Sequence, residues 1–124
     1  MRILVADDDP SMLDLVASTL RLEGFSVAEA RSGEDLIRLV GEGPLPDLVI
    51  TDVNMPPGID GIAVLSQLRR HHPDLPVILM SAFATPRLRA RAEQKGPAAA
   101  VLSKPIHLDE LRAEAARHAT APGR

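Results

Sequence analysis

Three aspartates, a serine and a lysine stand at the ends of short apolar segments in this sequence of 124 residues. Asp7 and Asp8 follow the first such segment, Asp52 follows the third, Ser81 closes the fourth and Lys104 follows the fifth. The carboxyl ends of neighbouring parallel strands meet at one edge of a sheet. If these segments are such strands, the three carboxylates, the hydroxyl and the ammonium group share one small patch.

Such a patch favours a divalent cation and a phosphoryl group as its ligands. Carboxylates a few Å apart repel one another, and a cation or a proton relieves that repulsion. Mg²⁺ is usually held by one or two carboxylates, together with water and phosphate oxygens. A lysine and a hydroxyl beside it can bind the other oxygens of a phosphoryl group. Since a carboxylate in this setting is also a nucleophile, the pattern predicts phosphorylation of an aspartate.

Each of these residues also has a simpler interpretation when it is taken alone. The run Asp7–Asp9 before Pro10 suits the start of a helix, where acidic side chains are favoured. Asp52 before a proline-rich turn is an ordinary turn residue, and Lys104 before Pro105 suits a surface turn. Taken separately, these interpretations do not predict that the acidic residues, the serine and the lysine all fall at the ends of four different apolar segments.

Five apolar segments alternate with five segments of helical periodicity. Most are continuously apolar, which is typical of parallel strands covered on both faces. In the segment that begins at Phe25, apolar and polar residues alternate instead, which favours an outer strand. The succession of apolar and helical segments along the chain predicts βαβ units and an α/β sheet with helices on both faces. The apolar segments are Ile3–Ala6, Phe25–Ala30, Asp47–Thr51, Pro76–Ser81 and Ala98–Ser103.

Capping signals predict where the helices begin and end. Asp9-Pro10 and Thr85-Pro86 each join an N-cap residue to a first-turn proline, and Ser32 suits the N-cap of the second helix. Gly24 stands where the first helix needs a left-handed C′ residue. The other predicted boundaries are Gly61–His72, an end at Gly96-Pro97 and a last helix opened by His107 or Asp109.

The composition indicates one globular domain and excludes several function classes. The sequence is 45% hydrophobic and 25% charged, and it has no cysteine for disulfides or thiolate chemistry. A net charge of −3 and the lack of Tyr and Trp argue against nucleic-acid binding. No apolar run reaches the ~20 residues of a membrane span, so we expect a cytoplasmic domain. The four histidines are interpreted as exposed or capping, and the basic stretch Arg87–Arg91 as a solvated helix face or a partner-docking surface.

The sequence resembles the receiver domain of bacterial two-component response regulators over essentially its whole length. The matching motifs are "ILVADDDP", "PDLVITDVNMP" followed by Asp-Gly, "PVILMSA" and "LSKP". The resemblance implies a flavodoxin-like, doubly wound (βα)5 fold with a five-stranded parallel sheet in the order 2-1-3-4-5. It implies a receiver domain over residues 1–119, with 120–124 as a flexible tail or the start of a linker.

The resemblance also implies a metal site. Asp52 matches the phosphoacceptor, and Asp8 and Asp52 match direct ligands of Mg²⁺, for which Mn²⁺ is a substitute. Asp7 matches the acid that acts largely through water. Asn54 matches the position whose backbone carbonyl completes the metal shell.

Further expectations concern phosphoryl transfer. Ser81 matches the switch hydroxyl, and Lys104 matches the phosphate-contacting lysine that precedes a cis bond to Pro105. The phosphoryl group is expected from a phosphohistidine of a sensor kinase or phosphotransfer protein. The domain is expected to be a signalling switch, monomeric or weakly dimeric, and not a multiple-turnover enzyme. The sequence names neither its kinase nor any output domain.

Two positions depart from the family pattern. Three residues before the lysine, where the family commonly has an aromatic residue, the sequence has Val101, so we expect a smaller change there on activation. The loop Pro56–Gly61 holds one residue more than the commonest pattern, and we expect it to affect partner contacts or the rate of hydrolysis.

Two alternatives remain at this point. One is a pseudo-receiver that binds partners without phosphorylation, although the acidic cluster and the lysine are both present. The other is a Mg²⁺-dependent phosphohydrolase with an aspartate nucleophile, which needs a general acid where this sequence has Asn54.

Overall fold

Five parallel strands form one sheet in the order β2-β1-β3-β4-β5, as predicted. The computed structural model describes residues 1–55, 58, 60–95 and 100–119. The predicted strand segments are confirmed with small shifts at their ends, of which the most relevant is that Asp52 is the last residue of β3. Residues 98 and 99 of the predicted fifth segment lie outside the described residues. The strands are β1 (Arg2–Ala6), β2 (Ser26–Ala30), β3 (Leu48–Asp52), β4 (Val77–Ser81) and β5 (Ala100–Ser103).

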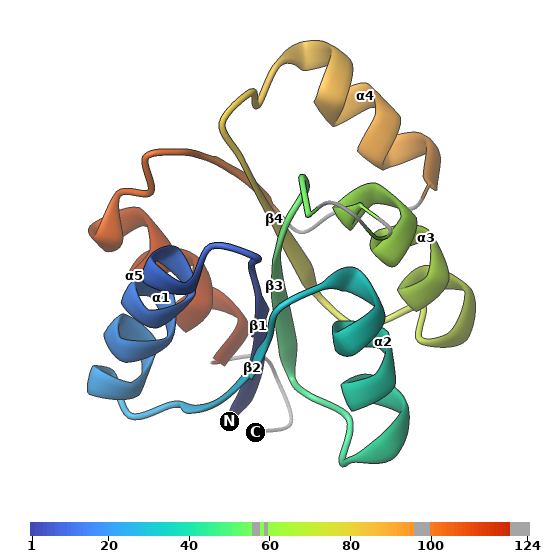
Figure 1. Cartoon of the computed structure of the whole chain (residues 1–124). Coiled ribbons are helices and arrows are strands. Elements are labelled where there is room, and N and C mark those ends of the chain that lie inside the picture. Colours follow the sequence, from blue (N-terminus) through green and yellow to red (C-terminus); the bar gives the residue numbers. More distant parts are fainter. Residues whose placement is uncertain (56–57, 59, 96–99, 120–124) are drawn as a thin grey trace.

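Helices cover both faces of the sheet (Figure 1). One face carries α1 (Pro10–Leu22) and α5 (Leu108–Ala119), which pack against each other. The other carries α2 (Gly33–Glu42), α3 (Gly61–His71) and α4 (Pro86–Lys95) side by side. The three layers confirm the predicted doubly wound α/β fold.

The predicted caps form the helix ends. The Asp9 carboxylate accepts a hydrogen bond from the amide of Ser11 at 2.9 Å, and the Ser32 hydroxyl accepts one from the amide of Asp35 at 3.0 Å. Gly24 takes the left-handed conformation expected after α1, with φ 94°. Glycine suits that position because a Cβ atom would disfavour the left-handed backbone conformation.

For three helices the observed boundaries can be compared with the predicted ones. The Thr85 hydroxyl accepts a hydrogen bond from the amide of Leu88 at 3.2 Å at the start of α4. The third helix ends at His71, one residue before the predicted end, and His72 is its C-cap. The last helix begins at Leu108, immediately after His107, and the predicted end at Gly96-Pro97 lies outside the described residues.

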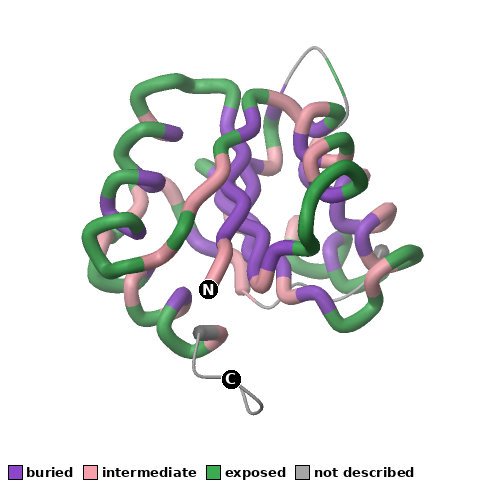
Figure 2. Tube along the Cα trace, turned by 90° about the horizontal axis from the view of Figure 1, so that it is seen from below, coloured by how far each residue is buried: buried purple, intermediate pink, exposed green. Residues whose placement is uncertain are grey.

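The central strands carry the core. All residues of β3 and β4 are buried, which Figure 2 shows as the purple strands between the two helical layers. Successive side chains point to opposite faces, so Val49 packs in the cluster under α2–α4 and Ile50 packs in the cluster under α1 and α5. This two-sided burial explains why the strand segments are continuously apolar. The predicted outer strand, β2, is the edge strand with several exposed or half-buried residues.

Among the described residues, no helix combines the length and the apolar character needed to span a bilayer. The segment 120–124, predicted to be a tail or a linker, lies outside the described part of the chain. Residues 56, 57 and 59 of the loop Pro56–Gly61 also lie outside it.

Candidate functional site: an acidic cluster at the strand ends

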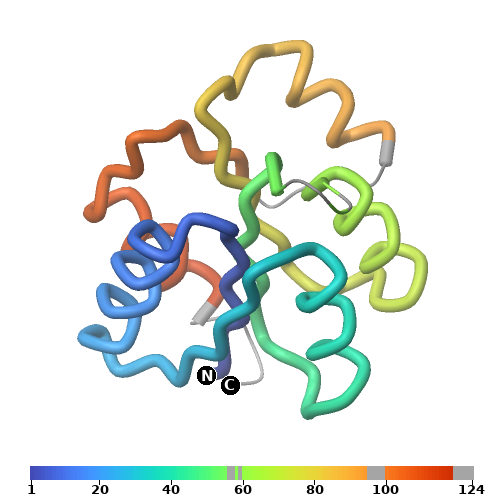
Figure 3. The backbone as a smooth tube through the Cα atoms, viewed as in Figure 1, coloured from blue at the N-terminus to red at the C-terminus, as the bar shows by residue number. Residues whose placement is uncertain are grey.

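The strand register aligns the residues that the sequence placed at strand ends. Ala6 of β1 pairs with Thr51 of β3, so Asp7 and Asp52 stand at the same level of the sheet. Ser81 of β4 pairs with Ser103 of β5, which places the following lysine beside the same edge. The backbone trace shows the loops that leave these four strands gathered at one end of the molecule (Figure 3).

Lys104 links two of the aspartates. Its Nζ lies 3.1 Å from Oδ2 of Asp7 and 3.1 Å from Oδ2 of Asp52. Asp7 is fully buried and Asp52 is 5% exposed, whereas Asp8 is exposed. Carboxylate oxygens of the three aspartates lie within 4.8 Å of one another. The predicted convergence of the carboxylates and the ammonium group is therefore present.

Backbone groups hold the two buried carboxylates in place. The amide of Asp9 donates to Oδ1 of Asp7 at 3.0 Å, so both oxygens of Asp7 have partners. The amide of Asn54 approaches Oδ1 of Asp52 at 3.4 Å, a long and weak hydrogen bond. The bond between Lys104 and Pro105 is cis, as expected.

The cluster carries more negative charge than Lys104 neutralises. Burial and the neighbouring Asp7 carboxylate raise the pKa of Asp52, and the lysine offsets only part of this. Burial by itself would lower the pKa of Lys104, but the attraction of Asp52 and Asp7 raises it. The lysine thus stays charged, and the carboxylates favour a further cation.

The donor set fits a hard divalent ion. Three carboxylates converge, one of them is solvent-accessible, and both oxygen ligands and access to water suit Mg²⁺. No histidine is part of this cluster. His71 and His107 are exposed, and His72 and His118 are partly buried.

Ser81, the last residue of β4, is 7% exposed, and its carbonyl accepts a hydrogen bond from the amide of Lys104 at 2.8 Å. Its Oγ accepts a hydrogen bond from the amide of Phe83 at 3.0 Å, so the hydroxyl fixes the start of the loop that leads to α4. Phe83 itself is 78% exposed. The serine is therefore joined through its backbone to Lys104 and through its side chain to the loop that leads to α4.

Gly61 has a structural role that was not predicted from the sequence. Its amide donates to the carbonyl of Val53 at 2.8 Å, and a Cβ at this position would lie 2.5 Å from the carbonyl oxygen of Asp52. Any side chain would displace the end of β3 that carries Asp52. The Asp-Gly pair after the loop could have indicated this role, because a glycine at such a position is typical of a close approach of two backbone segments.

Val101 occupies the position where the family commonly has an aromatic side chain. It is partly buried against the cluster under α2–α4, and its carbonyl accepts a hydrogen bond from Nη2 of Arg89 at 3.4 Å. This bond joins β5 to α4 across an exposed surface.

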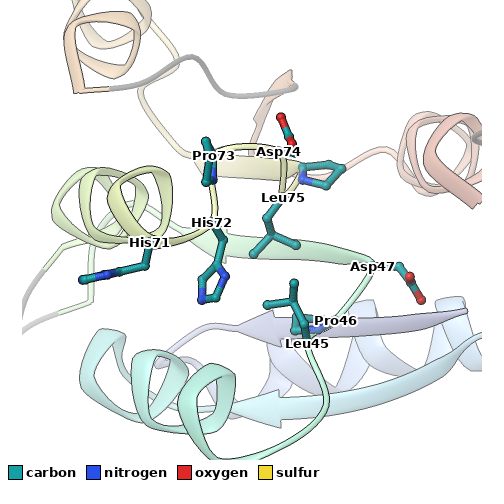
Figure 4. A pocket seen from close by; sticks show the side chains of 9 residues that line it. Leu45, Pro46, Asp47, His71, His72, Pro73, Asp74 and Leu75 are labelled. Carbon is teal, nitrogen blue, oxygen red and sulfur yellow. The ribbon is translucent and has the colours of Figure 1, made fainter.

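A separate hollow lies at the opposite end of the strands (Figure 4). It measures about 400 Å³ and opens where the chain enters β3 and β4. Leu45, His72 and Leu75 point toward one another in it, while Asp47 and Asp74 point away. It holds none of the predicted site residues.

Comparison with known proteins agrees with the geometry. The family model described as "Response regulator receiver domain" matches residues 3–116. The transcriptional regulatory protein PrrA of Mycobacterium tuberculosis is 39% identical over 110 residues, which cover 89% of this chain and 46% of PrrA. The transcriptional regulatory protein ZraR of Salmonella typhimurium is 38% identical over 110 residues, or 89% of this chain and 24% of ZraR. This chain spans less than half the length of these curated relatives.

Solved structures show the same fold. The receiver domain of NtrX from Brucella abortus superposes with a TM-score of 0.87 at 30% identity, covering 96% of this chain and 98% of that one. A CheY-like receiver domain from Methanospirillum hungatei gives a TM-score of 0.86 at 23% identity, covering 94% and 90%. At 23% identity, the similarity to the Methanospirillum hungatei domain supports the fold alone.

Proposed function

This chain belongs to the response regulator receiver domain family of two-component systems, and from that premise we propose that Asp52 is its phosphoacceptor. The supporting observation is that Lys104 Nζ lies 3.1 Å from the carboxylates of both Asp7 and Asp52. A lysine so placed is within reach of a phosphoryl group attached to Asp52.

In the proposed transfer, a carboxylate oxygen of Asp52 attacks the phosphorus of a phosphohistidine on a sensor kinase or phosphotransfer protein. An oxygen–phosphorus bond forms, the phosphorus–nitrogen bond breaks, and the electron pair of that bond returns to the imidazole. The imidazole then takes a proton from solvent. Asp52 is 5% exposed, which leaves a narrow approach for the donor.

A bound Mg²⁺, or Mn²⁺ in its place, would supply positive charge to the phosphoryl oxygens as they transfer. Asp8 and Asp52 are proposed as direct ligands, with Asp7 acting through water and Asn54 through its backbone carbonyl. The lysine contributes a second positive charge that the fold holds in position before the phosphoryl group arrives.

Ser81 is proposed to couple the arrival of the phosphoryl group to a conformational change at the protein surface. Its hydroxyl now accepts a hydrogen bond from the Phe83 amide, and it can donate its own proton to a phosphoryl oxygen. A shift of Ser81 would move the loop that leads into α4. Since Val101 has no ring to reorient, we propose that the change at β5 is small.

The domain is proposed to act as a cytoplasmic switch rather than as a multiple-turnover enzyme, in a monomer or weak dimer. Its partners would be the phosphohistidine donor and an effector or output domain. It would lose its phosphoryl group by slow hydrolysis.

Intact-mass measurement with a small acyl-phosphate donor and Mg²⁺ tests the assignment. We expect the added mass of one phosphoryl group on the protein, and none on Asp52→Asn, which lacks the nucleophilic oxygen. Asp14→Asn is the matched control, because Asp14 is an exposed aspartate of α1 outside the cluster.

Beryllofluoride with Mg²⁺ provides a second measurement by backbone amide shifts. Shifts around Asp52 and Ser81, with smaller ones at Val101, are expected. Failure of both reagents to act on the wild-type protein would favour a phosphorylation-independent pseudo-receiver. Repeated turnover of phosphate esters would favour a phosphohydrolase.

A further inference from the structure

Arginines from two helices line the seam between α3 and α4. The helices pack against each other on one face of the sheet (Figure 1). A hollow of about 360 Å³ between them is bordered by Asp60, Ser66, Gln67, Arg70 and Arg91. A second hollow, of about 440 Å³, is bordered by Arg87 and again by Arg91. The shared Arg91 makes the two hollows parts of one surface, which we call the α3–α4 seam.

Helical spacing directs the charges of α4 to two different sides. Arg87 and Arg91 are four residues apart and therefore lie on the same side, at the seam. Arg89 is on the other side, where it donates to the carbonyl of Val101 at 3.4 Å. Arg70 adds a guanidinium from α3. The planar guanidinium binds a carboxylate with two parallel hydrogen bonds, so the seam suits carboxylate ligands.

Asp60 is the one acidic side chain among the described residues that border these hollows. Its Oδ2 lies 3.9 Å from Nη2 of Arg91, and the two side chains are 44% and 55% exposed. Its Oδ1 accepts a hydrogen bond from the amide of Ala63 at 2.8 Å as the N-cap of α3. An exposed ion pair at this distance is weak, so a carboxylate of a ligand can take the place of Asp60 beside Arg91.

The seam has a surplus of positive charge in a chain whose net charge is −3. Within the described part of the chain, no ion pair involves Arg70 or Arg87, and both side chains are exposed. A single anion would bind such a surface only weakly, because each exposed ion pair contributes little free energy. A ligand with several carboxylates would bind more tightly, since the first ion pair holds the other carboxylates close to their arginines.

We propose that the α3–α4 seam binds an acidic peptide segment of a partner protein, and that Asp60 competes with that segment for Arg91. The two hollows spread across two helices, which fits an extended segment with carboxylates at intervals. Ser66 and Gln67 offer neutral hydrogen-bonding groups to the backbone of the segment. Nucleic acid is less suited, because the chain is acidic overall and has no Tyr or Trp for stacking. The site does not depend on phosphorylation of Asp52.

Titration of the unphosphorylated protein with two synthetic decapeptides tests this site. One alternates Glu with Ala, and the other alternates Gln with Ala. Backbone amide shifts at residues 60–70 and 85–94 should saturate with the Glu peptide and stay small with the Gln peptide. Arg91→Gln should weaken binding about fivefold or more, and raising the salt should weaken it further. Arg117→Gln, an exposed arginine of α5, should leave the affinity unchanged.

Asp60→Asn tests the competition. Asparagine retains the oxygen that caps α3, so the helix start is preserved while the negative charge near Arg91 is lost. The Glu peptide should then bind about two- to fivefold more tightly. The proposal is overturned if the Glu peptide binds no better than the Gln peptide or if its shifts map elsewhere. It is also overturned if Asp60→Asn fails to tighten binding, or if a short DNA duplex shifts the same amides as strongly as the Glu peptide does.

Discussion

The helices α1 and α4 begin with the same local signal but are held very differently. Both start with a capping side chain followed by proline, Asp9-Pro10 in one and Thr85-Pro86 in the other. In α4, among the residues whose burial is described, only Ala92 is buried, and Leu88 is partly buried. Capping therefore determined where both helices begin, and tertiary burial determined how firmly each is anchored. The buried residues of α1 are Leu13, Val16, Ala17, Thr19 and Leu20.

The difference separates two parts of the candidate site. Asp7 and Asp8 lead directly into the anchored helix, whereas Ser81 leads through a short loop into the weakly held one. A segment with few buried contacts opens and moves at low cost. The carboxylates are thus carried by a fixed element, and the hydroxyl is joined to an element that can change position.

The largest effect is expected from truncating one apolar side chain in each helix. Leu20→Ala in α1 should lower the free energy of unfolding by about 3 kcal/mol, because Leu20 is fully buried. Leu88→Ala in α4 should cost about 1 kcal/mol or less, because Leu88 is only partly buried. Urea unfolding followed by circular dichroism measures both. Equal losses would remove the contrast between the helices.

Native-state hydrogen exchange should show the same contrast without mutation. The amides of α4 should open with a free energy about 2 kcal/mol or more below that of the α1 amides, because fewer buried contacts must break. The amides of α3, which buries Ile62, Val64, Leu65 and Leu68, serve as the internal reference on the same face of the sheet. Protection in α4 that matches α3 would contradict the inference that α4 is weakly held.

Asp52→Asn should stabilise the protein by about 1 kcal/mol at pH 7 without divalent cations. Because the pKa of Asp52 is raised in the folded state, its ionisation opposes folding as the pH rises through that pKa. The gain should therefore disappear below the ordinary pKa of 3.8, where the carboxyl is protonated in both states. Lys104 keeps Asp7 as a partner at 3.1 Å in the variant.

Thermal unfolding between pH 3 and pH 8 checks this sign. Asp14→Asn, at an exposed position of α1, should change the stability by less than about 0.5 kcal/mol across the same range. A loss of stability in Asp52→Asn at pH 7 would mean that its ion pair with Lys104 outweighs its burial and its repulsion from Asp7.

The smallest effect is expected from Arg89→Ala. The hydrogen bond of Arg89 to the Val101 carbonyl is long, at 3.4 Å, and exposed, so its loss should change the stability by about 0.5 kcal/mol or less. Chemical denaturation at neutral pH gives this value directly. A loss above about 1 kcal/mol would show that this contact, rather than burial, fixes α4 to the sheet.

Much of the fold followed from local patterns in the sequence. The caps at Asp9, Ser32 and Thr85 were predicted and confirmed, because capping depends on residues within one turn. The strand segments were found because burial on both faces makes them continuously apolar. The strand order was implied by the family resemblance and not by periodicity, since neither apolar pattern nor spacing orders parallel strands.

The sequence by itself determined which side chains stand at the strand ends, because alternation and capping are local properties of the chain. Only the tertiary structure decided that Lys104 lies between Asp7 and Asp52, that Gly61 presses against the backbone of Asp52, and that Arg91 faces Asp60 across a seam. The physical reason is that such contacts join residues far apart in sequence. They depend on the register of the whole sheet and on how each helix packs onto it, which no local pattern contains.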